Sequence, residues 1–306
     1  GHLVAAATGA LFVFDRDLKR KDHVLFPGEH VENSVAIDEQ GIYVVTSKFM
    51  RKVVWTGTKL SMEAADGAWR SAYDVMPEGE AISRGAASHG SGTTPTLMGF
   101  ADDEDKLVLI SDGHPDGAQL VAFWRDEIPE GFEQKPGSRS RRIADQIRIR
   151  VSPTTVEASP AVYGNGVAVL NSTYPESAPW PLSIIGNAVL AGVTREPPLG
   201  LQKFEWNAAE DRFVEAWFLD DIDNTDWMPP AISAQNGLAY VATKVDSVYE
   251  YRAIDFETGA VVARWPFPDD SVLWNNWGGI TTLLEDGDLL LGGFFAVKRY
   301  NIGHLR

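Results

Sequence analysis

The sequence predicts an all-β chain built from repeated four-stranded sheets. A short phrase recurs five times, and a polar or glycine turn and a second apolar run follow each copy; the copies are Asn33–Ile37, Thr94–Met98, Ser159–Tyr163, Pro229–Ser233 and Gly278–Thr282. Counted from their second residues, the copies lie 61, 65, 70 and 49 residues apart. Periods of this size in an all-strand pattern are typical of a β-propeller, which has one four-stranded blade per repeat. Function in such a fold is expected at the mouth of the central channel.

Four strands, A to D, can be assigned in each complete repeat. The first repeat has Val35–Ile37, Ile42–Thr46, Arg51–Trp55 and Trp69–Val75, and the second has Thr96–Met98, Leu107–Ile110, Gln119–Trp124 and Ile143–Ile149. The third has Ala161–Tyr163, Val167–Leu170, Gln202–Trp206 and Phe213–Phe218, and the fourth has Pro230–Ser233, Leu238–Thr243, Glu250–Asp255 and Ala260–Trp265. Strands A and B are nearly continuous apolar runs, as expected for strands that are buried on both faces.

The two ends of the chain carry partial repeats. Gly1–Val4 aligns with Gly41–Val44, so the chain opens on a strand B, and the segment Ile280–Tyr300 supplies strands A, B and C but no D. We expect a single domain over residues 1–306 with six blades, seven or eight being the alternatives. A closing blade completed by residues before Gly1 is expected, because closure removes exposed sheet edges. The alternative is a short blade, with Gly1-His2 left from a tag.

Composition restricts the function classes. The formal net charge is −16 and the pI is about 4.8, which argues against nucleic acid or an anionic membrane as a partner. The chain has no cysteine, so disulfides, zinc–thiolate sites and cysteine nucleophiles are excluded. No apolar run approaches the roughly 18 residues of a membrane span. Although no signal peptide is visible, an acidic chain fits a periplasmic or secreted protein.

Carboxylates and amides gather at the predicted starts of the A strands, where their oxygens could form a ring around the axis. The set is Glu32, Asn33, Glu157, Asp226, Asn275 and Asn276. Calcium takes six to eight oxygen ligands of these types. We therefore predict a calcium site with Glu32, Glu157, Asp226 and Asn275 as ligands. The alternative is that these side chains cap strand ends or bind water.

Two histidines lie on loops of the same predicted face. The loop His89–Thr94 is rich in glycine, and Asp112-Gly113-His114 follows a strand B. A histidine near a carboxylate can act as a general acid or base, so His89, His114 and Asp112 are candidate catalytic residues. The alternative is a loop whose histidines only satisfy local hydrogen bonds.

A long insertion, 172–200, follows the strand B of the third repeat. It is rich in proline, and its centre is too apolar for a bare solvent loop. A lid, a homodimer contact and a packed excursion are all consistent with it. The candidate substrate-binding residues on this face are Lys48, Thr94, Trp180, Lys244 and Trp277.

One stretch resembles a known repeat. Ala253–Gly259 followed by Trp265 is similar to the tryptophan-docking repeat of quinoprotein-like (PQQ-type) propellers, and Lys203–Trp206 through Trp217 looks like a worn copy. The resemblance implies that the Trp packs between blades while the Asp and Thr-Gly shape a turn. Members that bind pyrroloquinoline quinone are usually longer and many carry a vicinal cysteine pair, so quinone binding and a quinone-dependent dehydrogenase are not expected here.

A looser resemblance, in blade count and in the oxygen ring, is to the calcium-centred gluconolactonase-type propellers. Together these features predict a small-molecule enzyme at the channel mouth, a calcium-assisted hydrolase of an ester or lactone. The alternative is a non-catalytic, extracytoplasmic propeller that binds a ligand or a protein.

Overall fold

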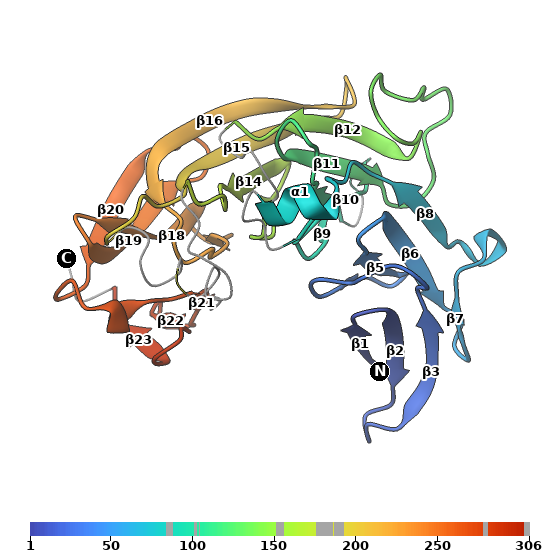
Figure 1. Cartoon of the computed structure of the whole chain (residues 1–306), viewed down its shortest axis with the longest axis horizontal. Coiled ribbons are helices and arrows are strands. Elements are labelled where there is room, and N and C mark those ends of the chain that lie inside the picture. The colour runs from blue at the N-terminus through green and yellow to red at the C-terminus, as the bar shows by residue number, and fades with distance from the viewer. Residues whose placement is uncertain are drawn as a thin grey trace. The chain divides into compact units, whose positions relative to one another are not determined.

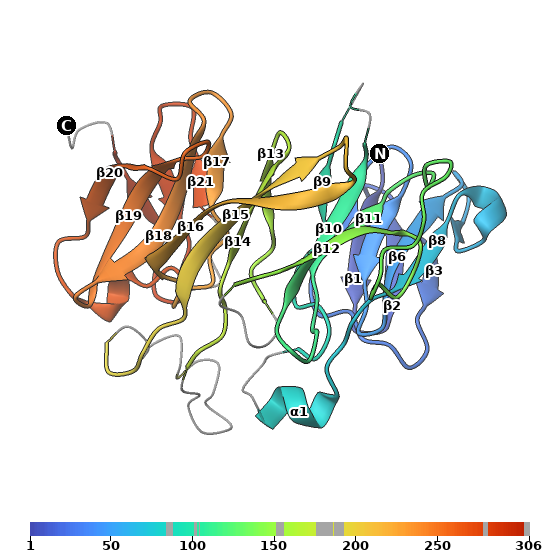
Figure 2. The ribbon, with the colours of Figure 1, turned by 90° about the horizontal axis from the view of Figure 1, so that it is seen from above.

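The computed structural model describes residues 1–83, 88–100, 103, 105–150, 156–175, 186, 193–277 and 281–302. Within these residues the strands form six sheets, and each sheet is made of strands that are consecutive in sequence (Figures 1 and 2). The chain is therefore nearly all β, and the predicted repeat of small antiparallel sheets is confirmed. In the same part of the chain, no helix is long and apolar enough to cross a membrane.

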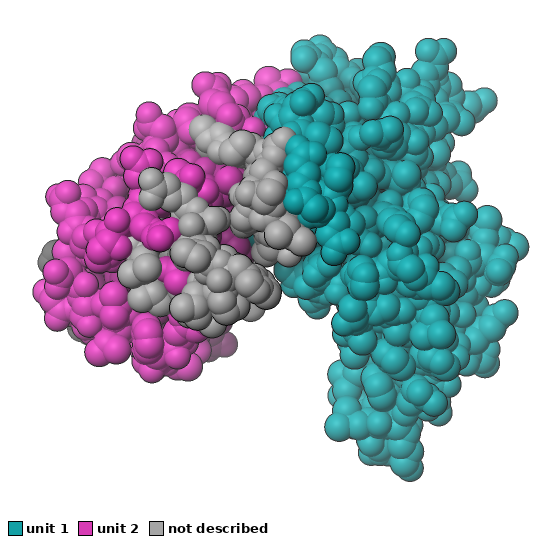
Figure 3. Space-filling view, viewed as in Figure 1, with its two compact units in different colours: residues 1–148, 153–160, 207–213 teal, residues 149–152, 161–206, 214–306 magenta. Residues whose placement is uncertain are grey.

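Contacts divide the chain into two compact units, coloured separately in Figure 3. Unit 1 comprises residues 1–148, 153–160 and 207–213, and unit 2 comprises residues 149–152, 161–206 and 214–306.

Unit 1 contains three sheets. The first is β1 (Leu3–Ala7), β2 (Ala10–Phe14) and β3 (Arg20–Leu25). The second is β4 (Ala36–Ile37), β5 (Ile42–Val45), β6 (Phe49–Trp55), β7 (Leu60–Ser61) and β8 (Trp69–Ala72), and the third is β9 (Thr96–Met98), β10 (Leu107–Ser111), β11 (Gln119–Trp124) and β12 (Ile143–Arg148). Two short helices are inserted, η1 (Ala64–Asp66) and α1 (Glu78–Ser83). The first sheet has three strands, as the alignment of Gly1–Val4 with a strand B predicts.

The outer part of the second sheet differs from the prediction. Both β7 and β8 pair with β6, β7 through Val54 and Trp55 and β8 through residues 49–52. The sequence pattern predicted one outer strand, Trp69–Val75, and missed β7, because a strand of two residues has no periodicity to detect. The observed β8 also ends earlier, at Ala72.

The core of unit 1 lies between neighbouring sheets. Every residue of β10 and of β11 is buried, as expected from their continuous apolar runs. One cluster joins the second and third sheets through Tyr43, Val108 and Phe123, and another joins the first and second sheets around Leu11 and Val44. Each of these sheets therefore buries an apolar face against its neighbour, because a single sheet cannot bury that face by itself.

Unit 2 contains the other three sheets. They are β13 (Ala161–Tyr163), β14 (Gly166–Leu170), β15 (Leu199–Asn207) and β16 (Arg212–Asp223); then β17 (Ala231–Ser233), β18 (Leu238–Val245), β19 (Val248–Asp255) and β20 (Val261–Pro266); then β21 (Thr281–Leu283), β22 (Leu289–Leu291) and β23 (Lys298–Tyr300). A short helix, η2 (Val272–Trp274), precedes the last sheet. A cluster of Tyr249, Tyr251, Phe267, Leu289 and Leu291 packs the last two sheets together.

A tryptophan joins two successive sheets of unit 2. Trp217 of β16 donates its indole N–H to the carbonyl of Phe256, at 3.0 Å, in the turn between β19 and β20. A Cβ at Gly259, in the same turn, would lie 2.8 Å from the Trp217 ring, so only glycine allows this approach. Asp255 Oδ1 accepts hydrogen bonds from the main-chain N–H and the hydroxyl of Thr258, both at 2.8 Å. Asp255, Thr258 and Gly259 thus shape this turn, and the tryptophan that packs against it is Trp217, not the Trp265 of the same stretch.

Unit 1 has a corresponding contact. Trp69 of β8 donates its indole N–H to the carbonyl of Arg125, at 2.9 Å, just after β11. The recurrence of the same bond between other sheets shows that it is part of how these sheets are joined. Trp265, by contrast, stacks on Tyr240 of its own sheet, with ring centroids 6.2 Å apart.

Candidate functional site

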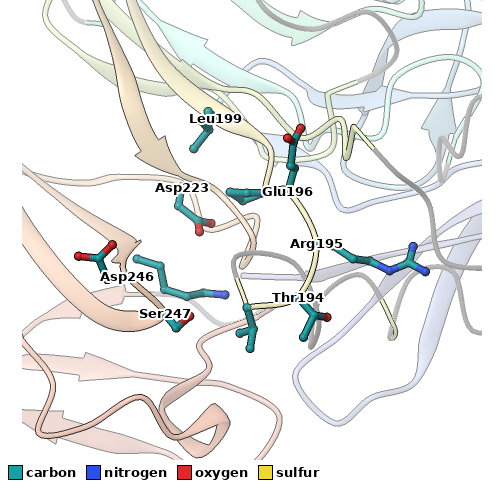
Figure 4. Close-up of a pocket in the computed structure, with 10 residues that line it drawn as sticks. Thr194, Arg195, Glu196, Leu199, Asp223, Asp246 and Ser247 are labelled. Atoms are coloured by element: carbon teal, nitrogen blue, oxygen red, sulfur yellow. The ribbon is translucent and has the colours of Figure 1, made fainter.

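A cavity of about 470 Å³ lies within unit 2 (Figure 4). One wall is the segment just before β15, and the other is formed by the end of β16 and by the β18–β19 hairpin. The lining residues are Val193, Thr194, Arg195, Glu196, Pro197, Leu199, Asp223, Lys244, Asp246 and Ser247. Its size suits a small organic ligand.

Hydrogen bonds between β16 and β18 fix the position of Asp223. The Asp223 main-chain N–H donates to Thr243 Oγ1, at 2.8 Å, which places Asp223 beside Lys244 at the end of β18. Asp223 Oδ1 accepts bonds from the N–H and the hydroxyl of Thr225, at 2.8 and 2.5 Å. Figure 4 shows the Asp223 carboxylate directed into the cavity, while the Arg195 guanidinium points away from it.

The rim of the cavity is a tight hairpin. Asp246 and Ser247 form the two-residue turn between Val245 and Val248, and both have positive φ angles, 50° and 69°. A two-residue hairpin of this kind needs left-handed backbone at both positions, and the asparagine-glycine pair that favours it is absent. The turn therefore holds a strained backbone next to the cavity, a feature that often accompanies function.

Two of the five charged residues that line the cavity, Asp223 and Lys244, are buried. Lys244 is 6% exposed and Asp223 is also 6% exposed. Burial raises the pKa of Asp223, and the Lys244 charge opposes the rise. Burial lowers the pKa of Lys244, against the attraction of Asp223 and Asp226, and its Nζ lies 4.7 Å from the centre of the Tyr249 ring. The charge on each of Asp223 and Lys244 thus stabilises the charged form of the other residue.

Behind this pair, Asp226 forms a buried network. Its Oδ1 accepts a bond from Asn275 Nδ2 and its Oδ2 from the Asn276 main-chain N–H, both at 2.8 Å. Asn275 Oδ1 accepts from the Trp277 N–H, at 2.9 Å, and Lys298 Nζ donates to the Asn275 carbonyl, at 2.6 Å. Burial raises the pKa of Asp226 to about 7 although these donors oppose it. Asp226 and Asn275 therefore meet, as predicted, but they bond each other.

The other two predicted metal ligands belong to unit 1. Glu157 accepts a bond from Ser88 Oγ, at 3.2 Å, and its carboxylate lies against Gly92, where a Cβ would come within 1.7 Å of Oε2. Asn33 Nδ2 donates to the Gly92 carbonyl, at 2.9 Å. Glu32 is exposed.

The donor arrangement gives calcium no support within either unit. Among the described residues, no group of three or more histidine, aspartate or glutamate side chains lies close enough to hold a metal ion. Both oxygens of Asp226 already accept hydrogen bonds. The predicted ring takes two ligands from each unit, and it stays a prediction.

The candidate catalytic residues of unit 1 lie on adjoining segments. A Cβ at Gly113 would lie 2.5 Å from the His89 carbonyl oxygen, so the two loops touch through their backbones. His114 reaches Asp112 only through its main-chain N–H, 3.2 Å from Oδ1, while its ring Nδ1 accepts from the Asp116 N–H, at 3.1 Å. His89 Nδ1 lies 3.3 Å from the Met76 carbonyl oxygen. Both imidazoles therefore have local partners.

Asp112 itself is fully buried. Oδ1 also accepts the Gln119 N–H, at 2.7 Å, and Oδ2 has no hydrogen-bond partner. Burial raises the pKa of this carboxyl to about 8. Burial thus favours the protonated form of this carboxyl, and its role as a catalytic group stays a prediction.

The predicted substrate-binding residues are dispersed. Lys244 lines the cavity of unit 2, and Trp277 stacks on Phe294 with ring centroids 4.6 Å apart. In unit 1, Thr94 donates its main-chain N–H to Ser159 Oγ, at 3.0 Å, and Lys48 is exposed. Trp180 and most of the 172–200 insertion lie outside the described residues. The predicted homodimer contact therefore stays a prediction.

The sequence placed Asp223 on the predicted mouth face but did not name it as a site residue. It ends the acidic run Asp220-Asp221-Ile222-Asp223, which lacks the spacing and the glycine of an EF-hand calcium loop. Asp220 and Asp221 are exposed, whereas Ile222 and Asp223 are buried, and this change within the run has no signal in the residue types.

Comparisons with known proteins support the fold. No family model matches the chain. An uncharacterized protein of Archaeoglobus fulgidus is 30% identical over 302 residues, which are 91% of this chain and 54% of that protein. The chain thus spans about half the length of the curated relative that it matches.

Solved structures of low sequence identity show the fold. The Dos1 propeller has a TM-score of 0.55 at 10% identity, covering 95% of this chain and 61% of the other. A candidate 6-phosphogluconolactonase of Bacteroides uniformis has a TM-score of 0.54 at 13% identity, covering 99% and 78%. Sqt1 of Saccharomyces cerevisiae has 0.52 at 11% identity, covering 99% and 68%. Together with the sheet order, these similarities show that the chain has a β-propeller fold.

Proposed function

We propose that the cavity of unit 2 hydrolyses a small ester or lactone, with Asp223 as general base and Lys244 as the stabilising cation. One observation carries the proposal: a buried carboxylate and a buried ammonium line the same cavity of about 470 Å³. Buried charges with shifted pKa values at the wall of a cavity are typical of active sites. Lactone chemistry has further support, because two propellers of similar structure are candidate 6-phosphogluconolactonases.

The chemistry follows from the two charges. A water held at the free side of the Asp223 carboxylate gives it a proton as its oxygen attacks the acyl carbon. The carbonyl oxygen becomes negative and is stabilised by the Lys244 ammonium, which is strong in a buried site. The acyl C–O bond then breaks, and the departing alkoxide takes the proton back from Asp223. The raised pKa of Asp223 makes it a stronger base than a solvated aspartate.

The test uses the purified chain with δ-valerolactone, glucono-δ-lactone and 4-nitrophenyl acetate, followed by proton release and by absorbance. Asp223→Asn keeps the acceptor for Thr225 but removes the base, so kcat/KM should fall about 10²- to 10⁴-fold. Asp220→Asn is the matched control, because Asp220 lies on the same strand and is exposed.

Two outcomes contradict the proposal. Equal kcat/KM for Asp223→Asn and wild type excludes Asp223 as the base. If no compound of the panel is hydrolysed, but one binds and Asp223→Asn weakens that binding, the cavity is a binding site without catalysis.

A further inference from the structure

Unpartnered polar atoms gather on two short segments of unit 2, 224–227 and 275–277. Within the described residues of this unit, every buried side-chain nitrogen or oxygen that lacks a hydrogen-bond partner belongs to Asn224, Trp227, Asn276 or Trp277. Asn276 is fully buried, and both its amide nitrogen and its amide oxygen are unpartnered. Buried polar atoms without partners are rare, because each costs about 1–3 kcal/mol. Their concentration here points to a missing partner.

The tryptophans of these two segments belong to a continuous series of four aromatic rings. Ring centroids are 5.3 Å apart for Tyr174 and Trp227, 6.1 Å for Trp227 and Trp277, and 4.6 Å for Trp277 and Phe294. The Tyr174 hydroxyl donates to the Thr225 carbonyl, at 2.8 Å, and the Trp277 indole lies close enough to lower the pKa of this hydroxyl. The unpartnered donors that remain are thus the Trp227 indole N–H and the Asn276 amide.

The backbone at Trp227 is strained. Its φ angle is 50°, in the left-handed region that a bulky residue rarely adopts. Such a conformation costs of the order of 1–3 kcal/mol and is found at ligand sites more often than elsewhere. Asp226 fixes the neighbouring loop, since its two oxygens hold the Asn275 amide and the Asn276 N–H. The aromatic and amide groups are therefore positioned before a ligand arrives.

We infer that these segments form a binding subsite for a neutral, polyhydroxylated ring, the chemistry of a sugar. A sugar hydroxyl both donates and accepts, and the subsite offers donors at Trp227 and Asn276 and acceptors at Asn224 and Asn276. The C–H face of such a ring packs on an aromatic face. A simple ion needs groups of one kind only, which this mixed set does not provide.

The subsite adjoins the proposed catalytic cavity through one loop. Asp223 lines the cavity, and the next residue, Asn224, donates its main-chain N–H to the Pro198 carbonyl and its Nδ2 to the Gly200 carbonyl, at 2.8 and 2.7 Å. The placement of an attached ester at Asp223 belongs to this proposal and rests on the proposed function. The substrate class that follows is a sugar lactone or a sugar ester.

Binding is tested apart from hydrolysis with methyl β-D-glucopyranoside, which has no ester. The chain has ten tryptophans, and Trp227→Phe identifies the indole N–H signal of Trp227 in a nitrogen-15 correlation spectrum. We expect saturable movement of this signal with the glucoside and none with cyclohexanol, which lacks the hydroxyl pattern. Asn276→Leu should weaken binding about tenfold or more, whereas Asn165→Leu, at an exposed site, should not.

Stability separates a binding role from a packing role. Because the Asn276 amide is unpartnered in the free chain, Asn276→Leu should keep or raise the melting temperature while binding is lost. A lower melting temperature together with normal glucoside binding overturns the subsite, and so does an unmoved Trp227 signal with glucoside and with myo-inositol. Glucoside binding without lactone turnover supports the subsite and contradicts the proposed function. Lactone turnover that Asn276→Leu leaves unchanged supports the proposed function and contradicts the subsite.

Discussion

Replacement of Gly259 by alanine tests the contact that joins the fourth and fifth sheets. Gly259 has a φ angle of 76°, and an added Cβ would lie 2.8 Å from Cγ and 2.9 Å from Cδ2 of Trp217. Left-handed backbone costs an alanine about 1–2 kcal/mol. Displacement of the indole also weakens its bond to the Phe256 carbonyl, which adds about 1 kcal/mol. The expected loss is therefore about 2–3 kcal/mol of unfolding free energy.

The matched control is Gly287→Ala. Gly287 has a φ angle of 86° and no atom within 4 Å of an added Cβ, so only the backbone cost of about 1–2 kcal/mol applies. Urea unfolding followed by circular dichroism measures both variants. In a Trp217→Ala background the cost of Gly259→Ala should fall to that of Gly287→Ala. Equal costs of Gly259→Ala in the two backgrounds would refute the proposed contact.

Three further predictions follow from buried charges. The pH–rate profile of lactone hydrolysis should be bell-shaped, because burial raises the pKa of Asp223 and lowers that of Lys244. The midpoint of the rising limb should lie at a higher pH than the usual pKa of aspartate, and the midpoint of the falling limb at a lower pH than the usual pKa of lysine. A profile that is flat from pH 4 to 10 contradicts this prediction. Burial raises the pKa of Asp112 to about 8, so between about pH 4 and 8 the folded chain holds a proton that the unfolded chain releases, and stability falls as pH rises. As pH rises across this range, the melting temperature of Asp112→Asn should therefore increase relative to that of wild type. A difference that stays constant with pH contradicts this prediction. Arg51 bonds both oxygens of Glu29 in a buried pair, so Arg51→Met should cost about 3–5 kcal/mol in urea unfolding and the added Glu29→Gln should recover part of it; no recovery means that the pair is not the cause.

Strands with a strong pattern could be predicted to within a residue. The apolar runs at Leu107–Ile110 and Gln119–Trp124 correspond to β10 and β11, because burial on both faces leaves few polar residues in the sequence. The outer strand β16 extends to Asp223, five residues beyond its predicted end, since its last residues show no alternation of apolar and polar side chains. Tertiary hydrogen bonds decide such ends.

The site was predictable in residue type but not in bonding. Lys244 was expected at a ligand site, and it lines the cavity of unit 2. Asp226 and Asn275 were expected to lie together, and they do, but the carboxylate accepts the amide instead of facing a metal. Asp223 was hidden in an acidic run, because its burial depends on the bond from its N–H to Thr243 on another strand. The group that each carboxylate oxygen faces is determined by the tertiary structure and cannot be predicted from residue type.

The indole bonds to Phe256 and Arg125 end on main-chain carbonyls, which every amino acid possesses. A mutation at either acceptor position therefore leaves the acceptor in place, and only the two tryptophans, with Gly259 against Trp217, are restricted. Neighbouring sheets can change most of their side chains over evolution and still recognise each other. This tolerance offers a physical reason why propellers that share this architecture can retain as little as 10% sequence identity.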